Sequence, residues 1–229
     1  MSRISRVVAV DLPHHITQRG NYRQDVFLSD DDRRKYLFWL QEYSIKYGLS
    51  ILVYCLMQNH VHFIAIPKKE DSLAKTFNAT HMRYAQHINK KLSRRGHLWQ
   101  GRFYSCVLDE PHLILACRYV ERNPVRAKIV GEPWQWPWSS ALAHISGKKD
   151  KFIHLHDLTS IIDMPSSAWK KYIGSIDEEN FLYAIRQKTL SGLPMGKDSF
   201  VERLEQDFER RLHLLAAGRP RIKKIRRCP

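Results

Sequence analysis

The sequence has few cysteines, no long apolar run and too few acidic residues to balance the basic ones. The four cysteines form no C-x-x-C pair and three of them lie in apolar segments, so we expect buried, reduced thiols. No stretch approaches the ~20 apolar residues of a membrane span, so no membrane partner is expected. The arginines near the amino terminus precede no hydrophobic region, so no secretory signal is expected either. These absences predict a cytoplasmic protein. The cysteines are Cys55, Cys106, Cys117 and Cys228.

The deficit of acidic residues leaves a strongly basic chain. Lys and Arg number 38 against 23 Asp and Glu, which gives a net charge of +15. With 11% aromatic residues interspersed, this excess favours nucleic acid as the partner and hence association with the nucleoid. A basic soluble protein without such a partner is the alternative interpretation. At 229 residues and 43% hydrophobic content, the chain can bury one sizeable core, or a core of about 150 residues with an appendage.

Turn and capping residues divide the amino-terminal part of the chain into alternating strands and helices. Gly20-Asn21 ends the first strand, Ser29 and the acidic residues after it begin the first helix, and Gly48 ends it. The order strand–helix–strand–strand–helix–strand–helix is typical of a ferredoxin-like or RRM-like α+β fold, an antiparallel sheet with helices on one face. We expect the other face to stay open for a ligand. The predicted strands are 14–19, 49–57, 60–67 and 98–108, and the predicted helices are 29–47, 71–93 and 111–123.

Two histidines, His60 and His62, lie in an apolar, β-branched and aromatic segment that favours a strand. Because side chains alternate on a strand, both imidazoles project from the same face, where such a pair can hold one divalent cation. A second His-x-His copy, 154–156, follows a lysine-rich stretch without a long apolar run, so we treat it as a chance match. His14 and His15 are interpreted as ordinary strand-end residues, because adjacent positions face opposite ways.

Tyr119 and Asn123 stand four residues apart on the last of these helices and so share one of its faces. If that face lies over the strand histidines, a cation held by His60, His62 and Asn123 polarises a scissile phosphate. Tyr119 then attacks the phosphorus as a covalent nucleophile, and it needs this help because a phenol has a pKa of about 10. The alternative is a core tyrosine with a hydrogen-bonded hydroxyl, the commoner state of a tyrosine between a helix and a sheet.

The rest of the chain is predicted to be a helical appendage with a basic tail. Ser175–Glu178 and Ser199–Glu202 are capping-box signatures, and the second opens an amphipathic helix. The apolar side of that helix comprises Val201, Leu204, Phe208, Leu212 and Leu215. The core closes with aromatic residues that we expect to pack: Trp134, Trp136 and Trp138. We divide the chain into a domain containing the histidines at 1–146, a helical extension at 147–217 and a flexible basic tail at 218–229.

Several short motifs in a fixed order resemble one family of DNA-processing enzymes. Asn59-His60-Val61-His62 and Tyr119-Val-Glu-Arg-Asn123-Pro-Val resemble the paired signatures of the HUH single-tyrosine transposases of the insertion-sequence type. They resemble more closely those of the REP-associated tyrosine transposases. The other matching motifs cover roughly residues 7–145 in the family's order: Ile16-Thr-Gln-Arg-Gly-Asn21 followed by Val26-Phe27, Leu98-Trp-Gln-Gly-Arg-Phe103, and Trp136-Pro-Trp-Ser-Ser140. Gly192-Leu-Pro-Met-Gly196 and Gly218-Arg-Pro220 resemble the extension of some members.

The resemblance implies cleavage of single-stranded DNA beside a hairpin, with Mg²⁺ or Mn²⁺ and no small-molecule cofactor. Tyr119 would become linked to a 5′-phosphate and leave a free 3′-OH. The third metal ligand would be Asn123, an oxygen donor compatible with Mg²⁺. Many members have proline where this chain has Gln58, a departure expected to alter the turn and not the ligands. Such sites are assembled within one chain or between two, so both a monomer and a homodimer remain open.

Three hypotheses about function remain open from the sequence. The first is a transesterifying DNA nuclease, and the second is a module that grips a hairpin and a single strand without cutting. The third is a metal-dependent hydrolase that activates water, which needs a carboxylate near the histidines, and the candidates are Glu121 and Asp109. DNA contacts are expected from Arg19, Asn21, Arg102, Arg122, Arg219, Arg221, Lys223 and Lys224.

Overall fold

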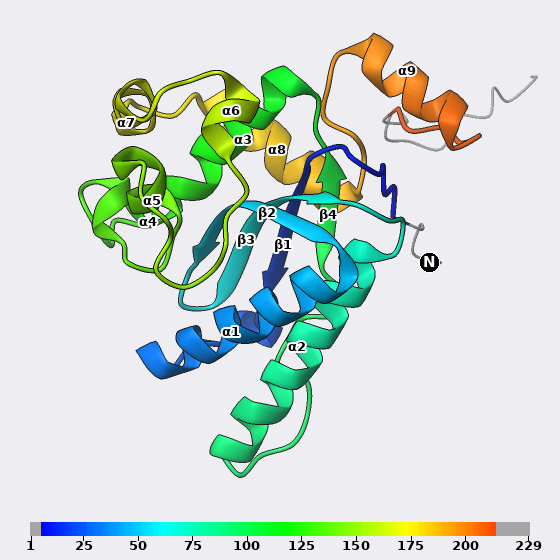
Figure 1. Cartoon of the computed structure of the whole chain (residues 1–229). Helices are drawn as coiled ribbons and strands as arrows, with labels where there is room; N and C mark the ends of the chain where they lie inside the picture. Colours follow the sequence, from blue (N-terminus) through cyan, green and yellow to red (C-terminus); the bar gives the residue numbers. More distant parts are fainter. Residues whose placement is uncertain (1–5, 214–229) are drawn as a thin grey trace, which may run out of the picture.

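The computed structural model describes residues 6–213 and contains a four-stranded antiparallel sheet in the order β2-β3-β1-β4. Helices alternate with these strands along the chain (Figure 1). The predicted α+β class with a ferredoxin-like alternation is therefore confirmed. The strands are β1 (His14–Arg19), β2 (Leu49–Leu56), β3 (His60–Pro67) and β4 (Tyr104–Val107). The helices between and after them are α1 (Asp30–Tyr47), α2 (Ser72–Lys91) and α3 (Glu110–Glu121).

The β2–β3 hairpin sets the position of the strand histidines. The backbone N–H of Met57 donates to the carbonyl of His60 across the turn (2.9 Å). His62 pairs with Cys55 of β2 on one side and with Thr17 of β1 on the other. His62 therefore lies in the interior of the sheet, and His60 projects from the same face at the start of β3.

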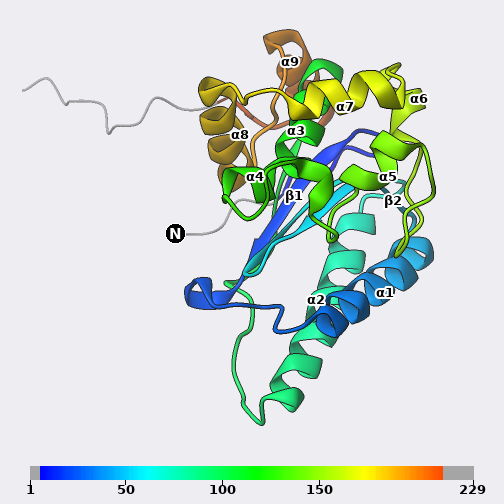
Figure 2. The same ribbon diagram turned by 90° about the vertical axis from the view of Figure 1, so that its left-hand side faces the viewer.

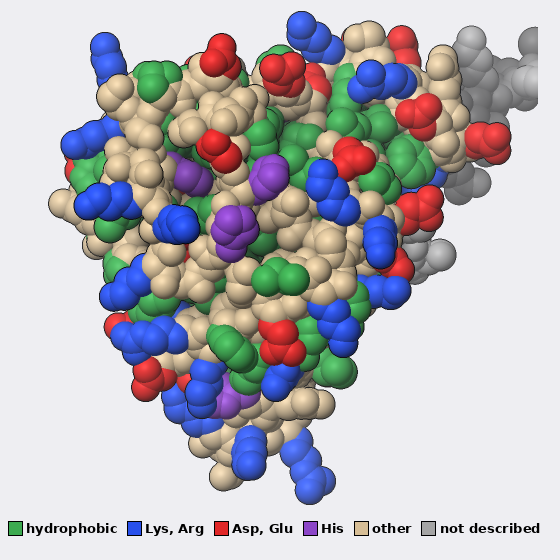
Figure 3. Space-filling view, in the orientation of Figure 1, with side chains coloured by type: hydrophobic (Ala, Val, Ile, Leu, Met, Phe, Trp, Pro, Cys, Tyr) green, Lys and Arg blue, Asp and Glu red, His purple; other side chains and the backbone are tan. Residues whose placement is uncertain are grey.

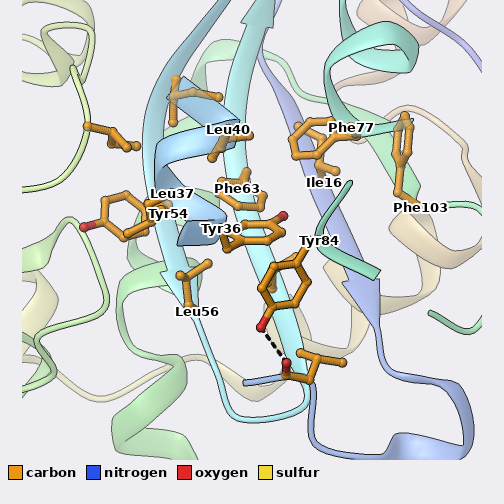
Figure 4. Packing of buried hydrophobic residues seen from close by; sticks show 14 of the residues in the cluster. Ile16, Tyr36, Leu37, Leu40, Tyr54, Leu56, Phe63, Phe77, Tyr84 and Phe103 are labelled. Atoms are coloured by element: carbon orange, nitrogen blue, oxygen red, sulfur yellow. Dashed lines mark hydrogen bonds between the residues drawn. The ribbon is translucent and has the colours of Figure 1, made fainter. Parts of the chain in front are cut away.

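Helix α1 begins and ends where the sequence predicts. The Ser29 hydroxyl oxygen accepts a hydrogen bond from the backbone N–H of Asp32, and Gly48 has the left-handed φ of 65° that closes many helices. α1 and α2 cover one face of the sheet with a buried aromatic and aliphatic cluster (Figure 4). Within it the Tyr84 hydroxyl donates to the carbonyl of Val26 (2.6 Å). Burial in this cluster stabilises the face of the sheet opposite the histidines.

The histidine-bearing face is also covered, which differs from our expectation of an open face. α3 and α8 (Glu179–Ser191) lie on this side, opposite α1 and α2 (Figure 2). The physical reason is that β2 and β3 are buried at almost every position, on both of their faces. Strands of that kind need a cover on each side. A ligand site on this face is therefore a cavity beneath helices and not an open platform.

Two predicted elements have different bounds in the structure. β4 contains only residues 104–107 of the strand predicted at 98–108. Gly101 has a φ of 137°, which interrupts a strand, and Trp99 makes only a single bridge, to Gly20. α3 ends at Glu121, and Asn123 begins the short helix α4 (Asn123–Arg126). The irregular segment before β4 runs beside the end of β1.

The carboxy-terminal part is helical, as predicted, but neither capping box caps a helix. Ser175 lies at the end of α7, where its hydroxyl donates to the Tyr172 carbonyl (2.8 Å), and Ser199 lies inside α9. α9 ends at Asp207, so Leu212 is buried beyond the helix, and Leu215 lies outside the described residues. The helices are α5 (Ala141–Ser146), α6 (Leu158–Ile162), α7 (Ser166–Gly174), α8 and α9 (Asp198–Asp207), and the 3₁₀ turns are η1 (Asn21–Arg23) and η2 (Pro133–Gln135).

The aromatic closing segment packs, as expected. Trp138 is buried and stacks on Phe152 with ring centroids 4.9 Å apart. Trp136 donates from Nε1 to the carbonyl of Leu56 (3.1 Å) and so attaches the segment to the edge of β2. Trp138 is therefore not available for base stacking.

The described cysteines agree with the expectation from the sequence. Cys55, Cys106 and Cys117 are buried and free, whereas Cys228 lies outside the described residues.

Lys and Arg side chains gather around the projecting end of α2 (Figure 3). Among residues 6–213, no helix is long and apolar enough to cross a bilayer. The divisions at 146 and 217 stay predictions.

Candidate active site

Four residues that the sequence singled out line one cavity of about 530 Å³. His60 and His62 reach it from β3, Tyr119 from α3 and Asn123 from the start of α4. All four belong to the one chain that the structure describes. The cavity lies between the histidine-bearing face of the sheet and the helices that cover it.

His60 is held in one tautomer by its neighbour. Its Nδ1 lies 2.6 Å from Oδ1 of Asn59, an oxygen that can only accept, so Nδ1 carries the proton. The orientation of the Asn59 amide is fixed in turn, because its Nδ2 donates to the carbonyl of Arg23 (3.1 Å). The His60 Nε2 lone pair is thus left available for a ligand.

His62 forms a stacked pair with a residue that the sequence interpretation set aside. Its Nδ1 lies 2.9 Å from Nε2 of His15, and the two rings are nearly parallel with centroids 5.1 Å apart. The ring of His60 stands at 84° to that of His62, also with centroids 5.1 Å apart. The Nε2 atom of His62 makes no hydrogen bond within the described chain, so both proposed ligands present a nitrogen without a protein partner.

Burial keeps these imidazoles neutral. Desolvation, with a smaller contribution from the positive charges of Arg19 and Arg126, lowers the pKa of His60 to about 4. The pKa of His62 is lowered well below its ordinary value, chiefly by burial, and that of His15 is lowered to about 3 for the same reason. A neutral imidazole is the form that binds a metal ion, so no proton has to leave near neutral pH.

These depressed values predict acid sensitivity of the metal-free fold. The pKa is about 4 for His14 and His60 and about 3 for His15 and His81, below the value of about 6.5 in an unfolded chain. The unfolded state therefore binds more protons between pH 6.5 and 4, and the free energy of unfolding falls as the pH is lowered through this window. Each histidine contributes up to roughly 3 kcal/mol at the acid end. Urea denaturation in EDTA from pH 7 to pH 4.5 measures the slope, which His97→Gln, an exposed change, should not alter. A flat profile would contradict the prediction.

Tyr119 is 5% exposed and lies edge-on to His62, with ring centroids 5.6 Å apart. The guanidinium carbon of Arg126 lies 4.2 Å from the centre of its ring, and Nη2 of Arg126 donates to its carbonyl (2.5 Å). The Tyr119 hydroxyl makes no hydrogen bond with any described residue. Tyr119 is therefore buried among apolar residues, as the alternative of a core tyrosine expects, but its hydroxyl lacks a bonded partner among the described residues.

Asn123 is oriented by its own helix. Its Nδ2 donates to the carbonyls of Tyr119 (3.2 Å) and Val120 (3.1 Å). The amide nitrogen is thereby occupied, and Oδ1 accepts no hydrogen bond within residues 6–213. An amide oxygen without a donor is a suitable ligand for a hard divalent cation.

The donor set fits a divalent metal ion with open positions. It consists of two neutral imidazole nitrogens and one amide oxygen, which leaves room for substrate oxygens and water. Within the described residues there is no group of three or more His, Cys, Asp or Glu side chains that could hold an ion. The second His-x-His copy, His154 and His156, lines a different cavity of about 680 Å³ and forms no such group either.

The carboxylates that a water-activating hydrolase requires lie elsewhere. Glu121 is fully buried and accepts hydrogen bonds from Ser140, His144 and Trp169. Asp109 caps α3 by accepting from the backbone N–H of His112 (3.0 Å). No Asp or Glu among the described residues lines the cavity that contains the histidine pair.

The expected DNA contacts are distributed unevenly. Arg19 lines the cavity, Asn21 lies in η1, and Arg102 is exposed. Arg122 is different: it is 8% exposed and donates to the Asp177 carboxylate (2.9 Å) and the Ile173 carbonyl (2.6 Å). Its guanidinium thus bonds to the extension in this structure, and its contact with DNA stays a prediction. The remaining four, Arg219, Arg221, Lys223 and Lys224, lie outside the described residues.

Sequence reasoning missed other residues of the cavity, among them His15, Arg126, Arg186 and Thr189. His15 was set aside because it adjoins His14, yet one of two adjacent strand residues must face the site. The core position of Ile16 was the usable signal, because it places His15 on the opposite face, with the ligands. Arg186 and Thr189 lie on α8, and nothing local in the sequence connects that helix to the histidines.

Residues 9–123 match the family model Y1_Tnp, described as IS200-like transposase. This range contains the whole sheet, α3 and the residues His60, His62, Tyr119 and Asn123. The match therefore places the chain in the class of transposases. Because the match spans half of the sequence, the chain belongs to the IS200-like transposase family.

The chain is also similar to solved structures. One is a REP-associated tyrosine transposase bound to a REP hairpin, with 16% identity and a TM-score of 0.55, covering 69% of this chain and 96% of the other. Another is a candidate transposase from Deinococcus radiodurans R1, with 20% identity and a TM-score of 0.38, covering 53% and 97%. Curated protein sequences give no match. The first likeness shows a shared fold, and with the family match it confirms the resemblance to REP-associated tyrosine transposases.

Proposed function

We propose that the chain cleaves and rejoins single-stranded DNA beside a hairpin, through a covalent bond between Tyr119 and a 5′-phosphate. Membership of a transposase family supports DNA cleavage as the general activity. The observation that carries the finer proposal is the meeting of Tyr119, His60, His62 and Asn123 in one cavity. Within residues 6–213 the tyrosine hydroxyl makes no hydrogen bond, and each imidazole keeps one nitrogen without a partner.

In the proposed reaction the Tyr119 oxygen bonds to the scissile phosphorus while the bond from phosphorus to the 3′-oxygen breaks. The phenol loses its proton and the departing 3′-oxygen gains one, so the products are a tyrosyl 5′-phosphodiester and a 3′-OH. One phosphodiester replaces another, and rejoining needs no external energy source. The positive charge of Arg126 over the ring stabilises the negative charge that the phenolic oxygen acquires.

Transposases of this family generally use a divalent metal. Here His60 and His62 through Nε2 and Asn123 through Oδ1 are the proposed ligands, with Mg²⁺ or Mn²⁺ as the ion. When bound, the ion polarises a phosphate oxygen and offsets the charge that develops on it. The protein's own contribution is to hold these three donors neutral and oriented, as Asn59 does for His60.

A DNA hairpin with a single-stranded flank is the proposed substrate. The similar structure of a REP-associated tyrosine transposase is bound to a REP hairpin, and the net charge of +15 favours a polyanion. Arg19, Asn21 and Arg102 are proposed to contact the strand near the cavity. The basic residues at 219, 221, 223 and 224 remain proposed phosphate contacts, and the cell's nucleoid is the proposed place of action.

A denaturing gel tests this function. The protein is incubated with Mn²⁺ and a hairpin oligonucleotide labelled at its 3′ end or, in a parallel reaction, at its 5′ end. We expect a protein adduct that carries the 3′-end label alone, because the fragment with the 5′-phosphate stays attached to Tyr119. EDTA should abolish it. Cleavage without an adduct would indicate a hydrolase, and binding without cleavage would indicate a DNA-binding module.

A further inference from the structure

A chain of buried polar atoms connects His62 to the carboxy-terminal extension. The Thr189 hydroxyl oxygen, on α8, lies 2.7 Å from Nδ1 of His15, and Nε2 of His15 lies 2.9 Å from Nδ1 of His62. The same hydroxyl lies 3.3 Å from the thiol sulfur of Cys106 on β4. All four side chains are buried.

Both ring nitrogens of His15 and Nδ1 of His62 have one neighbour each, and Nε2 of His62 has none among the described residues, so the proton positions are coupled. If His62 is to bind an ion through Nε2, its Nδ1 must carry the proton and donate to His15. His15 must then accept at Nε2 and carry its own proton at Nδ1, which donates to the Thr189 oxygen. The Thr189 hydroxyl proton is left to point at the Cys106 sulfur. In the reverse order Thr189 donates to Nδ1 of His15, and Nε2 of His15 donates to Nδ1 of His62. Nε2 of His62 then carries the proton and cannot bind the ion.

We infer that Thr189 and His15 are positioning residues that set the tautomer of His62, so that the extension forms part of the metal site. This inference rests on the proposed function, in which His62 is a metal ligand. Outer partners of a metal-bound histidine typically change metal affinity or activity by about 10–100-fold when they are removed. The extension would thus contribute to the chemistry through α8, a helix that carries neither Tyr119 nor any of the three proposed metal ligands.

The geometry gives Thr189 this role in preference to the other α8 residues at the cavity. Arg186 and Leu190 also line it, but neither makes a hydrogen bond to the imidazoles within the described chain. α8 is fixed at this position from its carboxy-terminal side, where the backbone N–H of Met195 donates to the carbonyl of Val107 on β4 (2.8 Å). The Thr189 hydroxyl is therefore presented to His15 by a firmly attached element.

The test compares Thr189→Val with Thr189→Ser in the full-length protein. Valine keeps the shape and removes the acceptor, so His15 is expected to move its proton to Nε2 and force His62 into the blocked form. Titration with Mn²⁺ alone, without DNA, followed by electron paramagnetic resonance, should show at least about tenfold weaker binding for valine. Serine should restore binding. Thr80→Val is the matched control, because Thr80 is equally buried and its hydroxyl bonds only to the Thr76 carbonyl in α2 (2.8 Å).

A second readout needs no metal and no variant of Thr189. Nitrogen-15 imidazole spectra of the metal-free wild-type protein, assigned with His62→Gln, report which ring nitrogen of His62 is protonated. A proton on Nδ1 supports the inference, and a proton on Nε2 overturns it. Mn²⁺ binding by Thr189→Val equal to that of the wild type overturns it as well.

Failure of the proposed function gives a different pattern. In that case wild-type Mn²⁺ binding would be unchanged by His62→Ala, whatever the effect of Thr189→Val. If His62→Ala abolishes binding and Thr189→Val does not weaken it, the metal site stands and only the role of the extension fails.

Discussion

Replacing Tyr119 by phenylalanine is expected to abolish the protein–DNA adduct and to lower strand cleavage by roughly 10³-fold or more, the scale on which losing a nucleophile acts. Phenylalanine keeps the ring edge-on to His62 and beneath Arg126, so only the attacking oxygen is removed. The hydroxyl makes no hydrogen bond in the described chain, so the free energy of unfolding should change little. The denaturing gel measures the adduct, and thermal melting confirms the fold.

The chain offers both a neutral control and a rival for this experiment. Tyr183 is 68% exposed on α8, and Tyr183→Phe should leave the adduct unchanged. Tyr104 also lines the cavity and is the rival nucleophile. An adduct that persists in Tyr119→Phe and disappears in Tyr104→Phe would overturn the assignment. Mn²⁺ binding measured in parallel should be equal for Tyr119→Phe and the wild type, because the phenol is not among the proposed ligands.

The residues of the site that the sequence predicted are those that follow the periodicity of a single strand or helix. His60 and His62 follow the two-residue period of a strand, and Tyr119 and Asn123 follow the four-residue spacing of a helix. The break between α3 and α4 does not separate the second pair, because Asn123 still bonds the Tyr119 carbonyl. Periodicity fixes which residues share a face. It does not fix what covers that face, because this depends on contacts between distant segments.

The features that the sequence did not predict have that second cause. Thr189 forms a hydrogen bond with His15 although the two residues are 174 positions apart in the chain. No local pattern in the sequence of α8 indicates this contact. Arg122 was assigned to DNA by its charge, but charge alone does not tell an arginine that faces a phosphate from one that faces an internal carboxylate. The two outcomes differ in burial, and burial here is decided by Asp177, which lies between α7 and α8.

Asp177 is the centre of a buried cluster of opposite charge. Three arginines from one side of α3 and α4 surround it: Arg118 at 4.0 Å, Arg122 at 2.9 Å and Arg126 at 3.3 Å. The carboxylate side chain is 11% exposed, and the guanidinium groups are 7–14% exposed. Arg118 also donates to the carbonyls of Ser175 and Ile176. The segment before α8 is therefore attached to the helices that carry Tyr119 and Asn123.

We therefore expect Asp177→Asn to destabilise the fold by about 3 kcal/mol, because removing one charge leaves its buried partners uncompensated. For a chain of this size the melting temperature should fall by about 6–12 °C. Urea denaturation and thermal melting measure the change. Glu178→Gln is the matched control, because Glu178 is the exposed neighbour and surface changes usually stay within about 0.5 kcal/mol. Equal stability of the two variants would show that the arginines are solvated and that other contacts attach the extension. A selective loss in Asp177→Asn would instead make this carboxylate the link between the extension and the helices of the proposed active site.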